Sequence, residues 1–214
     1  GKLTKDLRVG VLNIQTAKDE ENEIPSNNNT MIALQQRVFS RSNIGVFYIN
    51  RQSIGKNEFV DREDDYNRVV GLDYNLASKD NTWTGKMYAH KSFQPDDNVG
   101  NISAGANLRY NSRKYNFYVK GISIDEDFSS DLGFIRRTGI FKGIVGAERV
   151  FWPKKGIIQN HGFRFFPIFL WNPSLDFKNT DYDLMSSWKA TFKDQSKFEI
   201  ELTNSFTFLF DSFD

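Results

Sequence analysis

The sequence predicts an all-β fold, an antiparallel up-and-down transmembrane β-barrel with about eleven strands in its 214 residues. Three observations predict it. Apolar and polar residues alternate, long and short connections follow each other in turn, and aromatic residues stand beside the short connections. Single-chain bacterial barrels use even strand numbers, and an unsealed sheet edge is not viable in hydrocarbon. We therefore expect residues 1–214 to form one barrel domain that is a segment of a larger barrel.

The first expected strands lie between stretches rich in turn-forming residues. The polar stretch 18–29 contains Pro25 and three successive Asn, residues 40–42 form a tight connection, and 53–66 is long and charged. Between 67 and 77 the apolar residues fall on one face and the polar residues on the other. The five strands expected in this half are residues 7–17, 30–39, 43–52, 67–77 and 82–93.

Alternation is clearest in the second half of the chain. Apolar residues at every second position give a sheet one apolar and one wet face, as in 102–111 and 197–210. The apolar face of 102–124 carries Ala and Gly, which are too small to fill a protein core, whereas lipid chains would conform to them. Pro167 should interrupt the pairing of its strand. The strands expected here are residues 102–111, 115–124, 140–152, 157–171, 184–193 and 197–210.

The connections differ in length in a regular way. Those after the odd-numbered strands have roughly 8–15 residues and those after the even-numbered strands roughly 3–4, the asymmetry of outer-membrane barrels with short periplasmic turns. Aromatic rings beside short turns would suit a lipid–water interface. They are Trp83, Tyr110, Tyr115, Phe151, Trp152, Phe192 and Phe198.

Composition excludes several function classes. With 28 basic and 27 acidic residues, the net charge of +1 gives no reason to expect nucleic acid as a partner. The chain has no cysteine, so it has no disulfides, no thiol chemistry and none of the commonest zinc ligands. His90 and His161 are the only histidines and lie on separate expected strands. We expect no cofactor, no metal and no enzymatic activity.

If the apolar faces meet lipid, the polar faces line a lumen. Charges of both signs there usually pair with each other, and the alternative is a pathway or binding surface for an anionic or hydroxylated solute. The lumen-facing candidates are Asp73, Lys86, Asn107, Arg109, Lys120, Lys189, Glu199 and Glu201.

Two long connections carry further charged candidates. Arg136 and Arg137 could bind a carboxylate or phosphate, or form an ion pair within their own connection, with Asp125, Glu126, Asp127 or Asp131. The acidic cluster at 61–65 could hold calcium. However, it lacks the glycine-punctuated pattern of a calcium loop, so a solvated loop is favoured.

Four stretches of the sequence, taken in this order, carry a family resemblance. They are GVLNIQT at 10–16, SNIG at 42–45 after Arg37, NRVVGLD at 67–73 and DLGFIRR at 131–137. Together they resemble the membrane-barrel domain of the carbohydrate-binding family 9-like outer-membrane proteins of unknown function from Gram-negative bacteria. The resemblance covers roughly residues 1–150. It implies an outer-membrane location and, as partners, the lipid bilayer together with glycan or other outer-membrane or periplasmic proteins. We expect no counterpart of the sugar-binding-like domain that precedes the barrel in that family within residues 1–214.

The expected function is therefore that of an outer-membrane barrel protein, surface or transport associated, linked to glycan binding or uptake in a larger complex. Two alternatives stay open. A soluble carbohydrate-binding β-sandwich would bury the apolar faces of two sheets against each other. A hydrolase embedded in a barrel would depend on His90 or His161.

Overall fold

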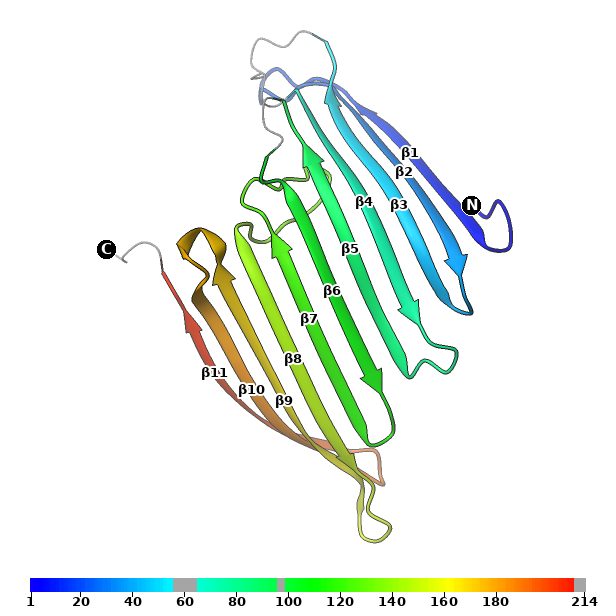
Figure 1. The fold of residues 1–214 in the computed structure, drawn as a ribbon, viewed down its shortest axis with the longest axis vertical. Coiled ribbons are helices and arrows are strands. Elements are labelled where there is room, and N and C mark those ends of the chain that lie inside the picture. The colour runs from blue at the N-terminus through cyan, green and yellow to red at the C-terminus, as the bar shows by residue number, and fades with distance from the viewer. Residues whose placement is uncertain (56–64, 96–98, 210–214) are drawn as a thin grey trace. The chain divides into compact units, whose positions relative to one another are not determined.

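A computed structural model of the protein describes residues 1–55, 65–95 and 99–209. Eleven antiparallel strands follow one another in a single sheet, in the same order as in the chain (Figure 1). The predicted all-β, up-and-down fold is confirmed. The described part of the chain contains no helix long and apolar enough to cross a membrane.

The strands have lengths typical of sheets that alternate between two environments, about 10–15 residues each. Their bounds are β1 (Leu7–Thr16), β2 (Asn27–Val38), β3 (Ser42–Ser53), β4 (Tyr66–Ala77), β5 (Trp83–Phe93), β6 (Ile102–Asn111), β7 (Tyr115–Ile124), β8 (Ile140–Phe151), β9 (Ile158–Asn172), β10 (Lys178–Phe192) and β11 (Lys197–Thr207). A 3-10 turn, η2 (Pro173–Leu175), follows β9.

One predicted connection is wrong. The long loop expected between Asn172 and Asp183 is reduced to residues 173–177, because β10 begins at Lys178 and pairs with the end of β9. The prediction for Pro167 is confirmed on one side of β9. The ladder with β8 stops at Ile168 and resumes at Phe165, since proline has no N–H to donate.

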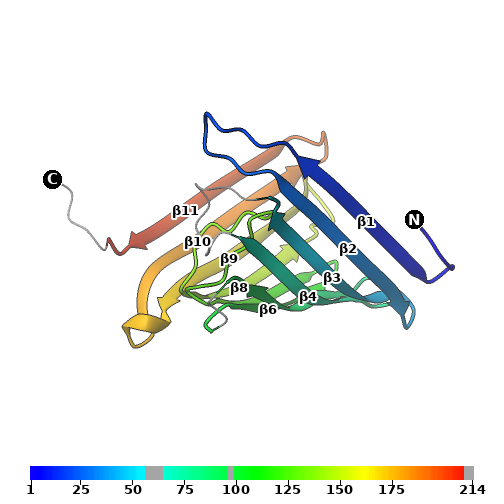
Figure 2. The ribbon, with the colours of Figure 1, turned by 90° about the horizontal axis from the view of Figure 1, so that it is seen from above.

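The sheet divides into two compact units, which we describe separately. Unit 1 comprises Gly1–Leu76, Lys86–Gly105 and Ser123–Gly139, and unit 2 comprises Ala77–Gly85, Ala106–Ile122 and Ile140–Asp214. Strands β1 to β4 lie side by side in unit 1, and β8 to β11 lie side by side in unit 2 (Figure 2).

In unit 1 the two faces of the sheet have opposite character. One cross-strand row, Val9–Leu34–Val46–Leu72, is apolar, and Val46 and Leu72 are 46% and 53% exposed. The neighbouring row on the other face is Arg8–Gln35–Gly45–Asp73. Two polar residues on that second face are buried, Asn67 being only 3% and Ser92 0% exposed, whereas Arg8 is exposed. The usual burial of apolar residues in a water-soluble protein is thus reversed.

Unit 2 repeats this arrangement. Phe117, Phe163, Phe165 and Leu202 are exposed on its apolar face. No second sheet is formed by residues 1–55, 65–95 and 99–209, so nothing there packs on the apolar face as a β-sandwich would require. Large buried apolar side chains are correspondingly few.

The predicted aromatic residues do gather at the short-turn end of unit 2. Trp83 lies 4.9 Å from Tyr110 between ring centroids, and Trp152 donates its indole N–H to the Arg113 carbonyl at 2.8 Å. Phe198 packs edge-on against Trp188. These rings form a partly exposed aromatic band on the apolar face beside the turns.

Aspartates organise two of the short turns. Asp80 accepts hydrogen bonds from the Thr82 hydroxyl at 2.6 Å, the Ser78 hydroxyl at 2.7 Å and the Thr82 amide at 3.0 Å. Asp194 accepts from the Ser196 hydroxyl and amide. These bonds favour the carboxylate form, so they lower the pKa of Asp80 and of Asp194 below their ordinary values.

Candidate functional site

A charged cluster lies on the polar face of unit 1. Asp73 of β4 forms an ion pair with Lys86 of β5, in which Oδ2 lies 2.8 Å from Nζ. The Oδ1 atom of Asp73 lies 2.9 Å from Nε2 of His90. Lys86 and His90 are four residues apart on β5, so alternation puts both on the same face. The predicted candidates Asp73 and Lys86 are thus partners, and His90, which the sequence analysis named only for the hydrolase alternative, is a third member.

Aromatic rings enclose this cluster. Phe47 meets the His90 ring edge-on, with centroids 4.9 Å apart, and Tyr88 lies 4.6 Å from His90. Glycines make room for both rings. A Cβ on Gly71 would lie 2.2 Å from the Phe47 ring, and one on Gly105 would lie 2.6 Å from the Tyr88 ring. The cluster is therefore packed against rings on the polar face.

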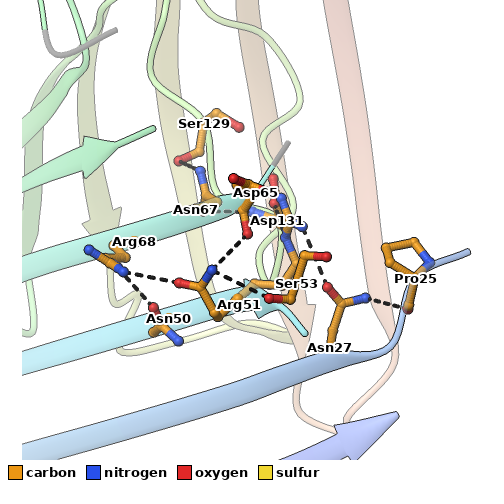
Figure 3. Close-up of polar contacts among 11 residues, drawn as sticks. Pro25, Asn27, Asn50, Arg51, Ser53, Asp65, Asn67, Arg68, Ser129 and Asp131 are labelled. Carbon is orange, nitrogen blue, oxygen red and sulfur yellow. Dashed lines mark hydrogen bonds and ion pairs between the residues drawn. The ribbon is translucent and has the colours of Figure 1, made fainter. Parts of the chain in front are cut away.

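The 125–139 connection folds against the polar face of unit 1. Asp131 lies 2.6 Å from Nε of Arg51 on β3, and its amide donates to Oδ1 of Asn67 on β4 at 3.2 Å (Figure 3). The Asn67 side-chain amide in turn donates to the Ser129 carbonyl at 3.3 Å. The buried Asn67 therefore has two partners on this connection.

A second anchor lies beside the first. The Ser129 amide donates to Oγ of Ser92 on β5 at 3.2 Å, and the neighbouring Phe128 is only 7% exposed. Residues 128–131 are thus held by three strands, β3, β4 and β5, at the end of unit 1 where the long connections lie.

Asp131, one of the acidic residues expected as a partner of the loop arginines, pairs with Arg51 of β3. The expected ion pair of Arg136 or Arg137 within their own connection stays a prediction. Arg136 is exposed and Arg137 half-buried. Of the acidic cluster at 61–65, residues 61–64 lie outside the described part of the chain.

Unit 2 carries a second polar site across β6 to β9. Glu148 of β8 accepts a hydrogen bond from Asn116 of β7 at 2.7 Å and faces Arg164 of β9 in the ladder. Tyr118 and Phe166 stack with centroids 5.9 Å apart. A shallow hollow of about 190 Å³ opens here.

Two guanidinium groups flank the stacked rings of this hollow. Arg109 lies 4.9 Å from the centroid of Tyr118, and Arg164 lies 4.8 Å from that of Phe166. Of these residues only Arg109 was among the candidates. The signal for Arg164 was the alternation of its strand, in which it stands between Phe163 and Phe165, whereas Glu148 stands between Ala147 and Arg149 and had no such signal.

The remaining lumen-facing candidates lie outside these two polar clusters. Lys189 and Glu199 face each other in the β10–β11 ladder at 3.4 Å, but both side chains are nearly half exposed, so the pair contributes little to stability. Glu201 is exposed and lies opposite Ser187. Asn107 and Lys120 are partly exposed on the polar face.

The histidines do not form catalytic dyads with a hydroxyl among the described residues. His90 pairs with Asp73, whereas His161 accepts the indole N–H of Trp188 at 3.3 Å on the apolar face of unit 2. In the same part of the chain no three His, Asp or Glu side chains converge as a metal site would need.

The fold and site together define an all-β protein whose single antiparallel sheet has one apolar exposed face and one polar face that carries charged and aromatic clusters. Comparisons with protein-family models, with curated proteins and with solved structures each found no match.

Proposed function

We propose that this chain forms part of the wall of a β-barrel in the outer membrane of a Gram-negative bacterium, as a surface or transport-associated protein without enzymatic activity. The observation that carries the proposal is the reversed polarity of the sheet. Val46 and Leu72 are exposed in register, while Asn67 and Ser92 are buried on the other face. A lipid bilayer would cover the apolar face and leave the polar face to water.

Water would be a poor solvent for this apolar face. Leaving apolar surface in water costs about 25 cal/mol for each Å². The exposed apolar side chains recur on every strand from β1 to β11 except β10, rather than in one patch. A single protein partner would cover a local patch, whereas lipid covers a whole face.

The connections and aromatic band support an orientation. Short turns of outer-membrane barrels face the periplasm, and aromatic residues favour the membrane interface. The aromatic band of unit 2 lies at its short-turn end. We therefore assign this end to the periplasmic side and the 125–139 connection to the outer side.

The solute that best fits the polar face is hydroxylated or anionic. Arg109 and Arg164 offer guanidinium donors beside the stacked rings of Tyr118 and Phe166, and Glu148 and Asn116 add an acceptor and a donor. The link to glycan rests in addition on the resemblance of the four stretches described above, and it remains a prediction.

Heat-modifiable gel mobility of the full-length protein in mild detergent tests the barrel. A folded barrel should migrate faster before boiling than after it. A protein that stays monomeric and soluble without detergent would rule the barrel out.

Transport can be tested with the same preparation. Arg164→Gln, assayed in vesicles, should slow the entry of an acidic oligosaccharide. Arg68→Gln, on the apolar face of unit 1, should not. Equal rates in the two variants would count against the proposed pathway.

The hydrolase alternative has no support from the contacts of either histidine. It would require His90→Ala or His161→Ala to abolish an activity against lipid or peptide. If the wild type shows no such activity, the hydrolase alternative is wrong.

A further inference from the structure

The apolar face of unit 2 is not uniform. Three cross-strand rows run over β8 to β11, and they begin at the short-turn end. In order from that end they are Phe151–His161–Ala190–Phe198, Arg149–Phe163–Trp188–Ile200 and Ala147–Phe165–Ser186–Leu202. In the third row the small residues Ala147 and Ser186 alternate with the large residues Phe165 and Leu202, so the surface is uneven there.

A groove of about 620 Å³ follows the second and third rows. Its sides are formed by Phe117, Phe163, Phe165, Trp188, Ile200 and Leu202, and Ala147 and Ser186 leave space between them. The volume lies within the roughly 300–1,000 Å³ of small-molecule sites. A lining of this kind fits an acyl chain.

One cation stands at the edge of the groove. The guanidinium of Arg149 lies 4.7 Å from the Phe151 ring centroid and 5.7 Å from that of Tyr115. Arg149 is exposed, and its cross-strand neighbour on β9 is Phe163. Within residues 1–55, 65–95 and 99–209 it forms no ion pair with a carboxylate. Its charge is therefore held among aromatic rings and open to an anion.

The turns at this end of unit 2 add to the positive charge. They span 78–82, 112–114, 152–157 and 193–196. Their basic residues are Lys79, Arg113, Lys114, Lys154, Lys155 and Lys193, and their acidic residues are Asp80 and Asp194. Both carboxylates are hydrogen-bonded within their own turns. A basic rim next to an apolar groove is complementary to a lipid with an anionic headgroup.

We propose that this groove is a binding site for an anionic phospholipid of the periplasmic leaflet. The acyl chain lies along Phe163, Phe165 and Trp188, and the phosphate lies at Arg149. This site rests on the proposed membrane location. It adds a specific lipid partner that a membrane location alone does not require.

The test uses the full-length protein in phosphatidylcholine vesicles that contain a small fraction of phosphatidylglycerol with brominated acyl chains. Bromine quenches a nearby indole, and Trp188 lies in the groove. Brominated phosphatidylglycerol should quench more strongly than brominated phosphatidylcholine at the same fraction. Trp188→Phe should remove this difference, which assigns the quenching to the groove.

Arg149→Gln should lower the preference for phosphatidylglycerol about fivefold, which corresponds to the ~1 kcal/mol of one basic side chain near an anionic lipid surface. Arg68→Gln is the matched control. Arg68 is also on an apolar face and stacks on Tyr66 at 4.0 Å, but its guanidinium already donates to Asn50 and Gln52. It should leave the preference unchanged.

Three results would overturn the site: equal quenching by the two lipids, a preference that survives Trp188→Phe, or equal losses in Arg149→Gln and Arg68→Gln. In each case the protein is in the vesicles and the proposed function stands. A wild-type chain that does not enter the vesicles would instead refute the proposed function, and the lipid site with it.

Discussion

Replacing Arg51 by methionine should loosen the 125–139 connection from the polar face of unit 1. Arg51 lies 2.6 Å from the Asp131 carboxylate, and the two side chains are 15% and 32% exposed. Methionine keeps an apolar stem of similar length and removes the guanidinium. Asp131 would then lose its charged partner, while the bonds of Asn67 to the connection would remain.

The free energy lost on removing the Arg51–Asp131 pair depends on how far the pair is buried. A hydrogen bond between charged groups contributes about 1.5–3 kcal/mol. Water can replace part of it at Asp131, which is nearly one-third exposed, so we expect about 1–2 kcal/mol. This is a factor of about 5–30 in the local opening equilibrium.

Amide hydrogen exchange measures the local opening equilibrium of this connection directly. The amides of Ser129 and Asp131 both donate to side chains on the sheet, so both should be protected in the wild type. In Arg51→Met they should exchange about 5- to 30-fold faster. Arg68→Met, which removes the same charge from the neighbouring strand, should leave both rates unchanged. Equal rates in the two variants would refute the assignment of Arg51 as the anchor of this connection.

Two further predictions concern packing and pH. Gly71→Ala should destabilise the fold by about 1–3 kcal/mol, because its Cβ would lie 2.2 Å from the Phe47 ring. Gly45→Ala, whose Cβ would come no closer than 3.7 Å to any atom beyond its chain neighbours, is the control, and equal urea midpoints would contradict the argument. Asp80→Asn tests the turn aspartate, since hydrogen bonds from Thr82 lower the pKa of Asp80. A lowered folded pKa contributes stability that is complete above the unfolded value of about 3.9 and is lost as the pH falls through the folded value. The stability difference between wild type and Asp80→Asn should thus stay constant between about pH 7 and 5 and shrink only below about 4, and a change above pH 5 would contradict it.

The sequence predicted the sheet well, since the signals that define it are local. Alternation within 102–111 and 115–124 gave those strands with the bounds of β6 and β7. It also placed Asp73, Lys86 and Arg109 on the polar face. The beginning of β10 was missed, because 178–183 contains Asn and Asp and was interpreted as loop.

The contacts that organise the polar face could not be predicted in the same way. Arg51 and Asp131 are 80 residues apart in the chain, and no local pattern links them. The pairing of Phe47 with Gly71 depends on the register between β3 and β4. Around Phe47, both faces of the strand carry apolar residues, so alternation does not tell which face its ring takes.

The order of the strands has a consequence for how such a chain can change in evolution. Each strand pairs only with the strands before and after it in sequence. Loop closure between neighbours costs little entropy, so each hairpin can form and dock on its predecessor. Duplicating or deleting one hairpin would therefore alter the width of the sheet by two strands and leave every other register intact. Sheet width and polar-face chemistry could then evolve independently, the first by gain and loss of whole hairpins and the second by single substitutions.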